Sequence, residues 1–299
     1  MPVWFSPYLL FPCVGAVLLA ALPALHWGLR RALRAPRLRE ADDLAAHGVA
    51  GQTVRIPTVR QRHLFGWWLP APADAGVPAS VAIILHGWGG NAEVMLPLAR
   101  PLLAAGHAVL LIDARSHGRS DDDDFSSLPR FAEDLDAALD WVRARADVDG
   151  DRIAVIGHSV GAGAALLCAA RGAPLAAVVS LAAFTHPAEI MRRWLASRRV
   201  PYWPLGWYVL RYVQRVIGFR FDAIAPINTI ARVRCPILLM HGADDATVPA
   251  SDAQRLYDRR SHAHVRLCIE PGAHDSMQDL LPHAGVITGF LAAALARPA

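Results

Sequence analysis

The sequence predicts an α/β fold in which a mainly parallel central sheet carries helices on both faces. Short apolar runs alternate with longer helical stretches from residue 81 onward, which is typical of strands joined by crossover helices. A Gly-X-Ser-X-Gly pentapeptide lies between one of these runs and the helical stretch after it. The chain has 299 residues, of which 54% are hydrophobic and 19% charged, so it is long enough for one large core.

The expected elements are bounded by Gly, Pro and polar residues. Residues 53–69 predict an initial hairpin of two strands, before the alternation begins. The strands expected after it are 81–86, 108–113, 153–157, 176–181, 236–241 and 264–269. The expected helices are 91–105, 130–146, 160–171, 251–260 and 283–296.

An insert of unusual composition, residues 186–222, lies between the expected strands 176–181 and 236–241. It contains eight aromatic residues and seven Arg, but only two acidic residues. We expect a short helical lid whose rings line an acyl pocket or rest against anionic lipid. Packing of the rings onto the domain is an equally good alternative. The candidate substrate-binding residues of this insert are Trp194, Trp203 and Trp207.

The N-terminal segment predicts a single-pass transmembrane helix. Residues 1–29 contain no charged side chain, and residues 8–29 are long enough to cross about 30 Å of hydrocarbon. A cleaved signal peptide is less well supported, because no basic region precedes the apolar run and no Ala-X-Ala site occurs between residues 16 and 35. A buried core helix is the other alternative. The predicted domains are therefore an anchor with an Arg-rich junction, residues 1–39, and a globular domain, residues 40–299.

The distribution of charge argues against a nucleic-acid partner, although the net charge is +4. Residues 1–39 hold five Arg and no acid, which leaves 25 basic against 26 acidic side chains in residues 40–299. Because these Arg follow the apolar run, the positive-inside rule predicts a cytoplasmic globular domain on a membrane anchor. No phosphate-binding glycine motif and no zinc-ligand spacing occurs, so no cofactor and no metal is expected. The four acids at 121–124 predict a solvated, mutually repelling run.

The pentapeptide Gly157-His158-Ser159-Val160-Gly161 is the most specific chemical feature. Between a strand and a helix, this pattern holds a serine on a tight elbow with its Oγ above the sheet. Serine needs a histidine base held by a carboxylate, in the chain order serine, acid, histidine. The acid is Asp244 or Asp245 after strand 236–241, which spacing alone does not decide, and the base is His274 after the last strand. Weaker histidine candidates are His117, His158 and His241.

Acyl transfer also needs two backbone N–H groups for the developing oxyanion. One is expected from Val160, directly after the serine. The other is expected from Trp88 in the sequence His-Gly-Trp-Gly-Gly at 86–90, whose glycines free the backbone to turn its amides inward.

Together these residues resemble the α/β-hydrolase fold family over about residues 53–297. HGWGG at 86–90 is similar to the oxyanion loop, and DARSHGRS at 113–120 is similar to the family's D-X-R-X-X-G-X-S turn. HGADDATVP at 241–249 is similar to the acid motif, and the family's aspartate position falls on Asp245. The N-terminal membrane segment and the insert after the sixth core strand most resemble Bem46-like and related bacterial serine hydrolases.

The resulting prediction is a serine hydrolase that cleaves a carboxylic ester or thioester through an acyl-enzyme. Ser159 attacks, His274 transfers the proton, Asp245 orients the histidine, and the Trp88 and Val160 amides hold the oxyanion. The expected partner is a small acyl ester or thioester, with a lipid-like substrate favoured by the aromatic insert. A peptidase, an amidase or an acyltransferase uses the same triad. A catalytically silent membrane-tethered binding protein is the alternative from another class.

Overall fold

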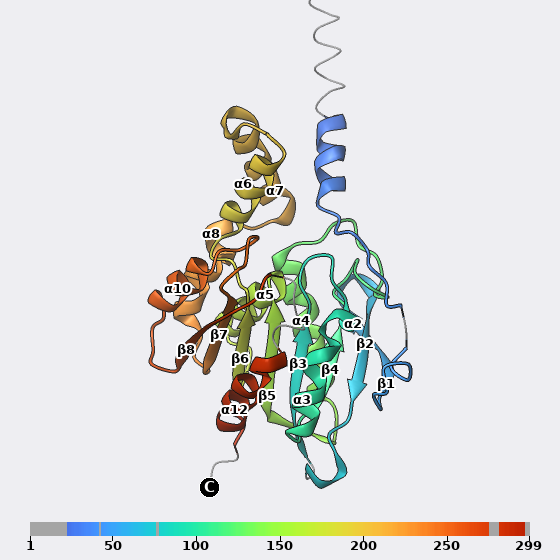
Figure 1. The fold of residues 1–299 in the computed structure, drawn as a ribbon. Coiled ribbons are helices and arrows are strands. Elements are labelled where there is room, and N and C mark those ends of the chain that lie inside the picture. The colour runs from blue at the N-terminus through green and yellow to red at the C-terminus, as the bar shows by residue number, and fades with distance from the viewer. Residues whose placement is uncertain (1–22, 42, 76–77, 275–280, 297–299) are drawn as a thin grey trace, which may run out of the picture.

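A computed structural model describes residues 23–41, 43–75, 78–274 and 281–296. They form one eight-stranded sheet with the strand order β1-β2-β4-β3-β5-β6-β7-β8 (Figure 1). Strand β2 is antiparallel to β1 and β4, and the remaining neighbours are parallel. The strands are β1 (Gln52–Thr58), β2 (Arg62–Leu69), β3 (Ala79–Leu85), β4 (Ala108–Ile112), β5 (Val148–His158), β6 (Ala177–Leu181), β7 (Ile237–Gly242) and β8 (Val265–Glu270).

The sheet separates two apolar cores, because successive side chains of a strand point to opposite faces. In β3, Val81, Ile83 and Leu85 belong to one core, whereas Ala82 and Ile84 belong to the other. The first core is covered by α4 (Leu128–Arg143), α5 (Val160–Ala170) and α10 (Ser251–Asp258). The second core is covered by α2 (Ala92–Met95), α3 (Ala99–Ala104) and α12 (Ala284–Ala294).

The predicted mainly parallel sheet with helices on both faces is confirmed. The expected strands all form, and the initial hairpin becomes β1 and β2 with the short η1 (Val59–Gln61) between them. The expected helix 91–105 is interrupted by η3 (Leu96–Leu98), where Pro97 has no N–H to donate to the preceding turn. The other short helical segments outside the insert are η2 (Ala73–Ala75), α9 (Pro226–Thr229), η5 (Ile230–Arg232) and η6 (Leu281–His283).

The insert between β6 and β7 is helical. It consists of α6 (Pro187–Ser197), η4 (Tyr202–Gly206), α7 (Trp207–Ile217) and α8 (Phe221–Ile224). Figure 1 shows α6 and α7 standing away from the sheet, on the same side as the blue helix near the N-terminus.

That N-terminal helix comprises residues 23–32. Most of the predicted transmembrane segment, residues 8–29, lies outside the described residues. Within the described part of the chain, no helix combines the length and the apolar composition that a membrane span requires. Residues 33–41 continue from the helix across the globular domain, where Arg37 pairs with Asp122 at 3.3 Å and Glu40 with Arg119 at 3.4 Å.

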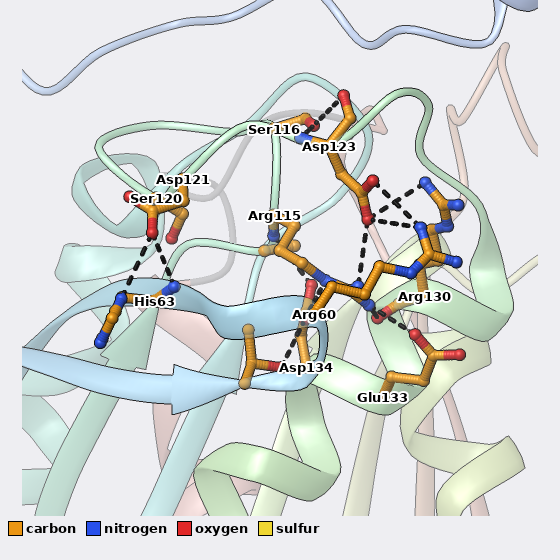
Figure 2. Close-up of polar contacts among 12 residues, drawn as sticks. Arg60, His63, Arg115, Ser116, Ser120, Asp121, Asp123, Arg130, Glu133 and Asp134 are labelled. Carbon is orange, nitrogen blue, oxygen red and sulfur yellow. Dashed lines mark hydrogen bonds and ion pairs between the residues drawn. The ribbon is translucent and has the colours of Figure 1, made fainter.

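The prediction of a solvated, mutually repelling run at 121–124 was wrong for Asp123, whereas the side chains of Asp122 and Asp124 are 78% and 53% exposed. Asp123 is 8% exposed and lies 3.1 Å from Nη1 of Arg60 and 3.1 Å from Nη1 of Arg115. Figure 2 shows this carboxylate among guanidinium groups from separate segments, with Arg130 also 3.2 Å away. Attraction to these three cations therefore outweighs repulsion between chain neighbours, and the tertiary fold brings Arg60 to Asp123 from 63 positions away.

Candidate active site

Ser159 occupies a sharp turn between β5 and α5. Its φ of 53° and ψ of −113° are a strained conformation for a residue with a side chain. The turn depends on the flanking glycines, since a Cβ on Gly157 would lie 2.3 Å from the carbonyl oxygen of Gly161. A Cβ on Gly161 would lie 2.5 Å from the carbonyl oxygen of His86. The Ser159 N–H donates to the Leu181 carbonyl at 2.8 Å, so β6 holds the turn in place.

The three residues predicted as a triad meet in space from three loops. Nε2 of His274 lies 3.1 Å from Oγ of Ser159, and Nδ1 of the same ring lies 2.6 Å from Oδ2 of Asp245. With Nδ1–H donating to the carboxylate, Nε2 is left to accept the serine proton. His274 follows β8 and Asp245 follows β7, so both approach from the carboxyl ends of parallel strands.

Asp245 is held as a carboxylate by hydrogen bonds. Burial raises its pKa, but donation from His241 and His274 and from the Val248 N–H outweighs burial, and the pKa falls well below its ordinary value. Oδ1 accepts from the backbone N–H groups of Thr247 at 2.9 Å and Val248 at 2.7 Å. The side chain is therefore ionised and fixed in orientation at neutral pH.

Asp244, the alternative acid, is exposed, and its backbone N–H donates to the Gly272 carbonyl at 3.0 Å. The structure thus brings Asp245 to the histidine and leaves Asp244 at the surface. His158 lies on the other side of the triad, where its Nε2 donates to the His274 carbonyl at 2.8 Å. This contact fixes the backbone of His274 rather than its ring.

His241 contacts the triad more closely than the sequence indicated. Its Nε2–H faces the Val248 carbonyl at 2.8 Å and Oδ2 of Asp245 at 3.2 Å, and its side chain is fully buried. It is the first residue of the HGADDATVP segment, four positions before the aspartate. That spacing, at the end of a strand, is the feature by which the contact could have been predicted.

The oxyanion loop, residues 86–90, is held by a buried histidine. His86 Nε2 accepts from the Ala114 N–H at 3.0 Å, so Nδ1 carries the proton and donates to the Gly87 carbonyl at 2.6 Å. Burial, and then the nearby His117 ring, lower the pKa of His86 well below its ordinary value. Trp88 and Val160, the predicted oxyanion donors, both line the cavity that contains Ser159.

That cavity has a volume of about 670 Å³, which is in the range of pockets that enclose a small molecule. The triad and the oxyanion loop form one side. Aliphatic residues of the insert form another, among them Ile190 and Met191 of α6 and Val213 of α7. No charged side chain of the described residues lines the cavity.

Of the three tryptophans predicted to bind substrate, only Trp194 lines the cavity. Trp203 and Trp207 lie outside it and face each other with ring centroids 5.6 Å apart. For Trp207 the reason is helical periodicity, because Val209, Val213 and Ile217 of α7 recur every four residues and turn one stripe toward the cavity. Trp207 precedes that stripe by two positions and points away from it.

Comparison with known proteins shows which family the chain resembles. A family model described as the alpha/beta hydrolase family matches residues 82–286. The uncharacterized protein Rv2307c of Mycobacterium tuberculosis is 31% identical over 232 residues, which are 78% of this chain and 75% of that protein.

Solved structures show the same fold at lower identity. The esterase Pf2001 of Pyrococcus furiosus superposes with a TM-score of 0.70 at 23% identity, over 88% of this chain and 100% of that one. Est1E of Butyrivibrio proteoclasticus, solved with ferulic acid bound, has a TM-score of 0.65 at 20% identity, over 82% of this chain and 100% of that one. The chain belongs to the α/β-hydrolase family.

Proposed function

We propose that the protein is a serine hydrolase that cleaves a carboxylic ester or thioester through an acyl-enzyme. The observation that carries this proposal is the continuous hydrogen-bonded chain from Asp245 through His274 to Ser159, at 2.6 and 3.1 Å, on one side of an apolar cavity. The similarity in fold to Pf2001 and Est1E, of which the first is an esterase by its description, supports an ester in particular.

The reaction follows from the positions of these groups. Nε2 of His274 takes the proton of Ser159 as Oγ attacks the acyl carbon, and the carboxylate of Asp245 stabilises the imidazolium that forms. The Trp88 and Val160 N–H groups hold the oxyanion of the tetrahedral intermediate. Collapse of that intermediate expels the alkoxide or thiolate, which His274 protonates, and leaves the acyl group on Ser159. A water molecule activated by His274 then releases the acid.

The test is hydrolysis of p-nitrophenyl esters of increasing acyl length by the full-length chain in detergent micelles, with Ser159→Ala as the control. We expect Ser159→Ala to lose at least about 10³-fold in kcat. Wild-type turnover by Ser159→Ala would overturn the proposal.

Labelling with a fluorophosphonate separates the alternatives. A protein labelled at Ser159 but silent on all esters is a peptidase, amidase or acyltransferase. A folded protein that is neither labelled nor active is a binding protein.

We further propose that the protein is a membrane-anchored hydrolase like the Bem46-like branch, with its catalytic domain in the cytoplasm. The support is the uncharged sequence of residues 1–29 and the five Arg that follow it. Protease treatment of sealed inverted vesicles tests the orientation. Digestion of the catalytic domain without detergent is expected, and protection would reverse the orientation.

A further inference from the structure

The N-terminal helix, residues 23–32, forms part of the cavity that contains Ser159. Leu29 and Ala32, with Leu33 directly after the helix, line this cavity. The aliphatic stripe of α7 lines it too, through Val209, Val213 and Ile217. The pocket is therefore enclosed by a segment that precedes the α/β-hydrolase elements in the sequence and by the insert between β6 and β7.

The N-terminal helix is fastened to α7 by aromatic and hydrogen-bonded contacts. Nε2 of His26 lies 2.5 Å from the hydroxyl of Tyr208, and the His26 ring stacks on Tyr212 with centroids 4.3 Å apart. Nε of Arg30 donates to the hydroxyl of Tyr212 at 3.3 Å. These contacts hold the helix and α7 together as one unit.

The end of the helix is fastened to the catalytic loops as well. The Leu33 carbonyl accepts from the Ser126 N–H at 3.1 Å, and Nε of Arg34 donates to the Asp124 carbonyl at 3.2 Å. Pro36 packs on the oxyanion loop so closely that a Cβ on Gly89 would lie 2.9 Å from its Cγ. The position of residues 29–33 relative to Ser159 is thus set from both ends.

We propose that residues 29–33 form a specificity-determining wall of the acyl site, and that the substrate carries a long aliphatic acyl chain lying between this wall and α7. The proposal rests on the proposed hydrolase function. The cavity is polar at the triad and aliphatic along both helices, which matches an ester group at one end and a hydrocarbon chain beyond it. A short acyl group would leave the surface of Leu29 and Leu33 uncovered.

The experiment places a bulky side chain on this wall. Ala32→Trp puts an indole into the cavity from the helix, whereas Gly28→Trp is its matched control, because a Cβ at Gly28 meets nothing within 4 Å and the residue does not line the cavity. Full-length wild type and both variants are assayed in detergent with p-nitrophenyl acetate and p-nitrophenyl dodecanoate. The readout is the ratio of kcat/KM for dodecanoate to that for acetate. Fluorophosphonate labelling of Ser159 verifies that each variant is folded.

We expect the ratio to fall at least tenfold in Ala32→Trp and to change less than twofold in Gly28→Trp. An unchanged ratio in a labelled Ala32→Trp protein would refute the proposal that residues 29–33 select the acyl chain. A wild type that hydrolyses acetate and not dodecanoate would refute it as well. If Ala32→Trp fails to label, Leu29→Asp replaces it, since a carboxylate in the wall repels the chain without adding bulk. Absence of serine-dependent hydrolysis and of labelling in the wild type is a different result, which refutes the hydrolase proposal itself.

Discussion

The two sides of the cavity are built by different means. On the triad side, each functional atom is fixed by a hydrogen bond from a loop at the end of a parallel strand, as in the 2.6 Å contact between His274 and Asp245. On the side of α7 and the N-terminal helix, aliphatic side chains such as Val213 and Leu29 face the cavity and make no directional contact with the triad. Hydrogen bonds can hold the reacting groups in place, which catalysis requires because it tolerates little displacement of them. An apolar surface can instead select a hydrocarbon chain by its size.

The largest loss of activity on the triad side is expected when its acid, Asp245, is replaced by a neutral side chain. Asp245→Asn is expected to lower kcat about 10⁴-fold, because the amide no longer favours the histidine tautomer with a free Nε2. Asp244→Asn is expected to stay within about twofold, since its side chain is exposed and its backbone contact with Gly272 survives the change. Both kcat values are measured on one short ester, with circular dichroism as the folding control. A larger loss in Asp244→Asn would exchange the two roles.

The triad side is also expected to respond to acid, whereas Leu29, Ala32 and Leu33, the residues of the wall that line the cavity, carry no titrating side chain. Burial lowers the pKa of His117, beneath Trp88, to about 4. The unfolded chain has an imidazole pKa of about 6.5, so between these values it binds more protons than the folded state. The stabilising contribution is complete above pH 6.5 and is lost as the pH falls toward 4, a loss of about 3 kcal/mol.

Thermal unfolding followed at pH 7.5 and pH 5 measures this contribution. In His117→Asn, the difference in Tm between the two pH values is expected to shrink. A part of the difference is expected to remain, because burial also lowers the pKa of His86. An identical pH dependence in wild type and variant would show that His117 is not a source of the acid sensitivity.

A smaller effect is expected from the residue that supports the acid. His241→Phe removes the donor that lies 3.2 Å from Asp245 and is expected to lower kcat about tenfold with little change in KM. His241→Gln, which keeps an N–H donor, is expected to recover part of the loss. Equal losses in both variants would indicate that the ring acts through packing alone.

The smallest effect is expected on the aliphatic side. Val213→Ala shortens one side chain of the α7 stripe and is expected to lower kcat/KM for a dodecanoate ester about threefold more than for acetate. Trp203→Ala, outside the cavity, is the control and is expected to leave both values unchanged for these substrates. If Trp203→Ala changed the chain-length preference instead, Trp203 would contact the acyl chain, and the assignment of this side chain to the outside of the cavity would be wrong.

Prediction from the sequence succeeded where geometry is decided locally. The elbow at Ser159 depends on two glycines within two residues of it, and a strand before and a helix after it are enough to aim Oγ. The strands and helices were predicted in the same way, from the spacing of apolar residues over short stretches of sequence. An acid at 244 or 245 and His274 were predicted by their places after strands, and the resemblance to the family's acid motif favoured Asp245. The contact between Asp245 and His274 is a consequence of the neighbouring parallel strands β7 and β8.

Features decided by tertiary contact were not predictable in this way. Aromatic bulk suggested Trp203 and Trp207 as substrate contacts, but neither lines the cavity, and α7 turns Val209, Val213 and Ile217 to it instead of Trp207. The role of residues 29–33 is invisible in the sequence, since they lie 126 positions or more before Ser159 and meet its cavity only in the fold. The same holds for the pairing of Asp123 with arginines from three segments.

The ion pairs around residues 121–124 differ in how they respond to ionic strength. Arg115 and Asp134 are each 1% exposed and lie 2.6 Å apart, where dissolved salt hardly reaches them. Arg37 and Asp122, which tie the junction to this region, are 24% and 78% exposed, and mobile ions screen such a pair within a Debye length of about 8 Å at physiological salt and about 3 Å at 1 M. Concentrated salt therefore weakens the Arg37–Asp122 pair while the Arg115–Asp134 pair persists. The uncharged contacts of the same segment, the Leu33–Ser126 backbone bond and the packing of Pro36 on Gly89, do not depend on the electrolyte around the protein.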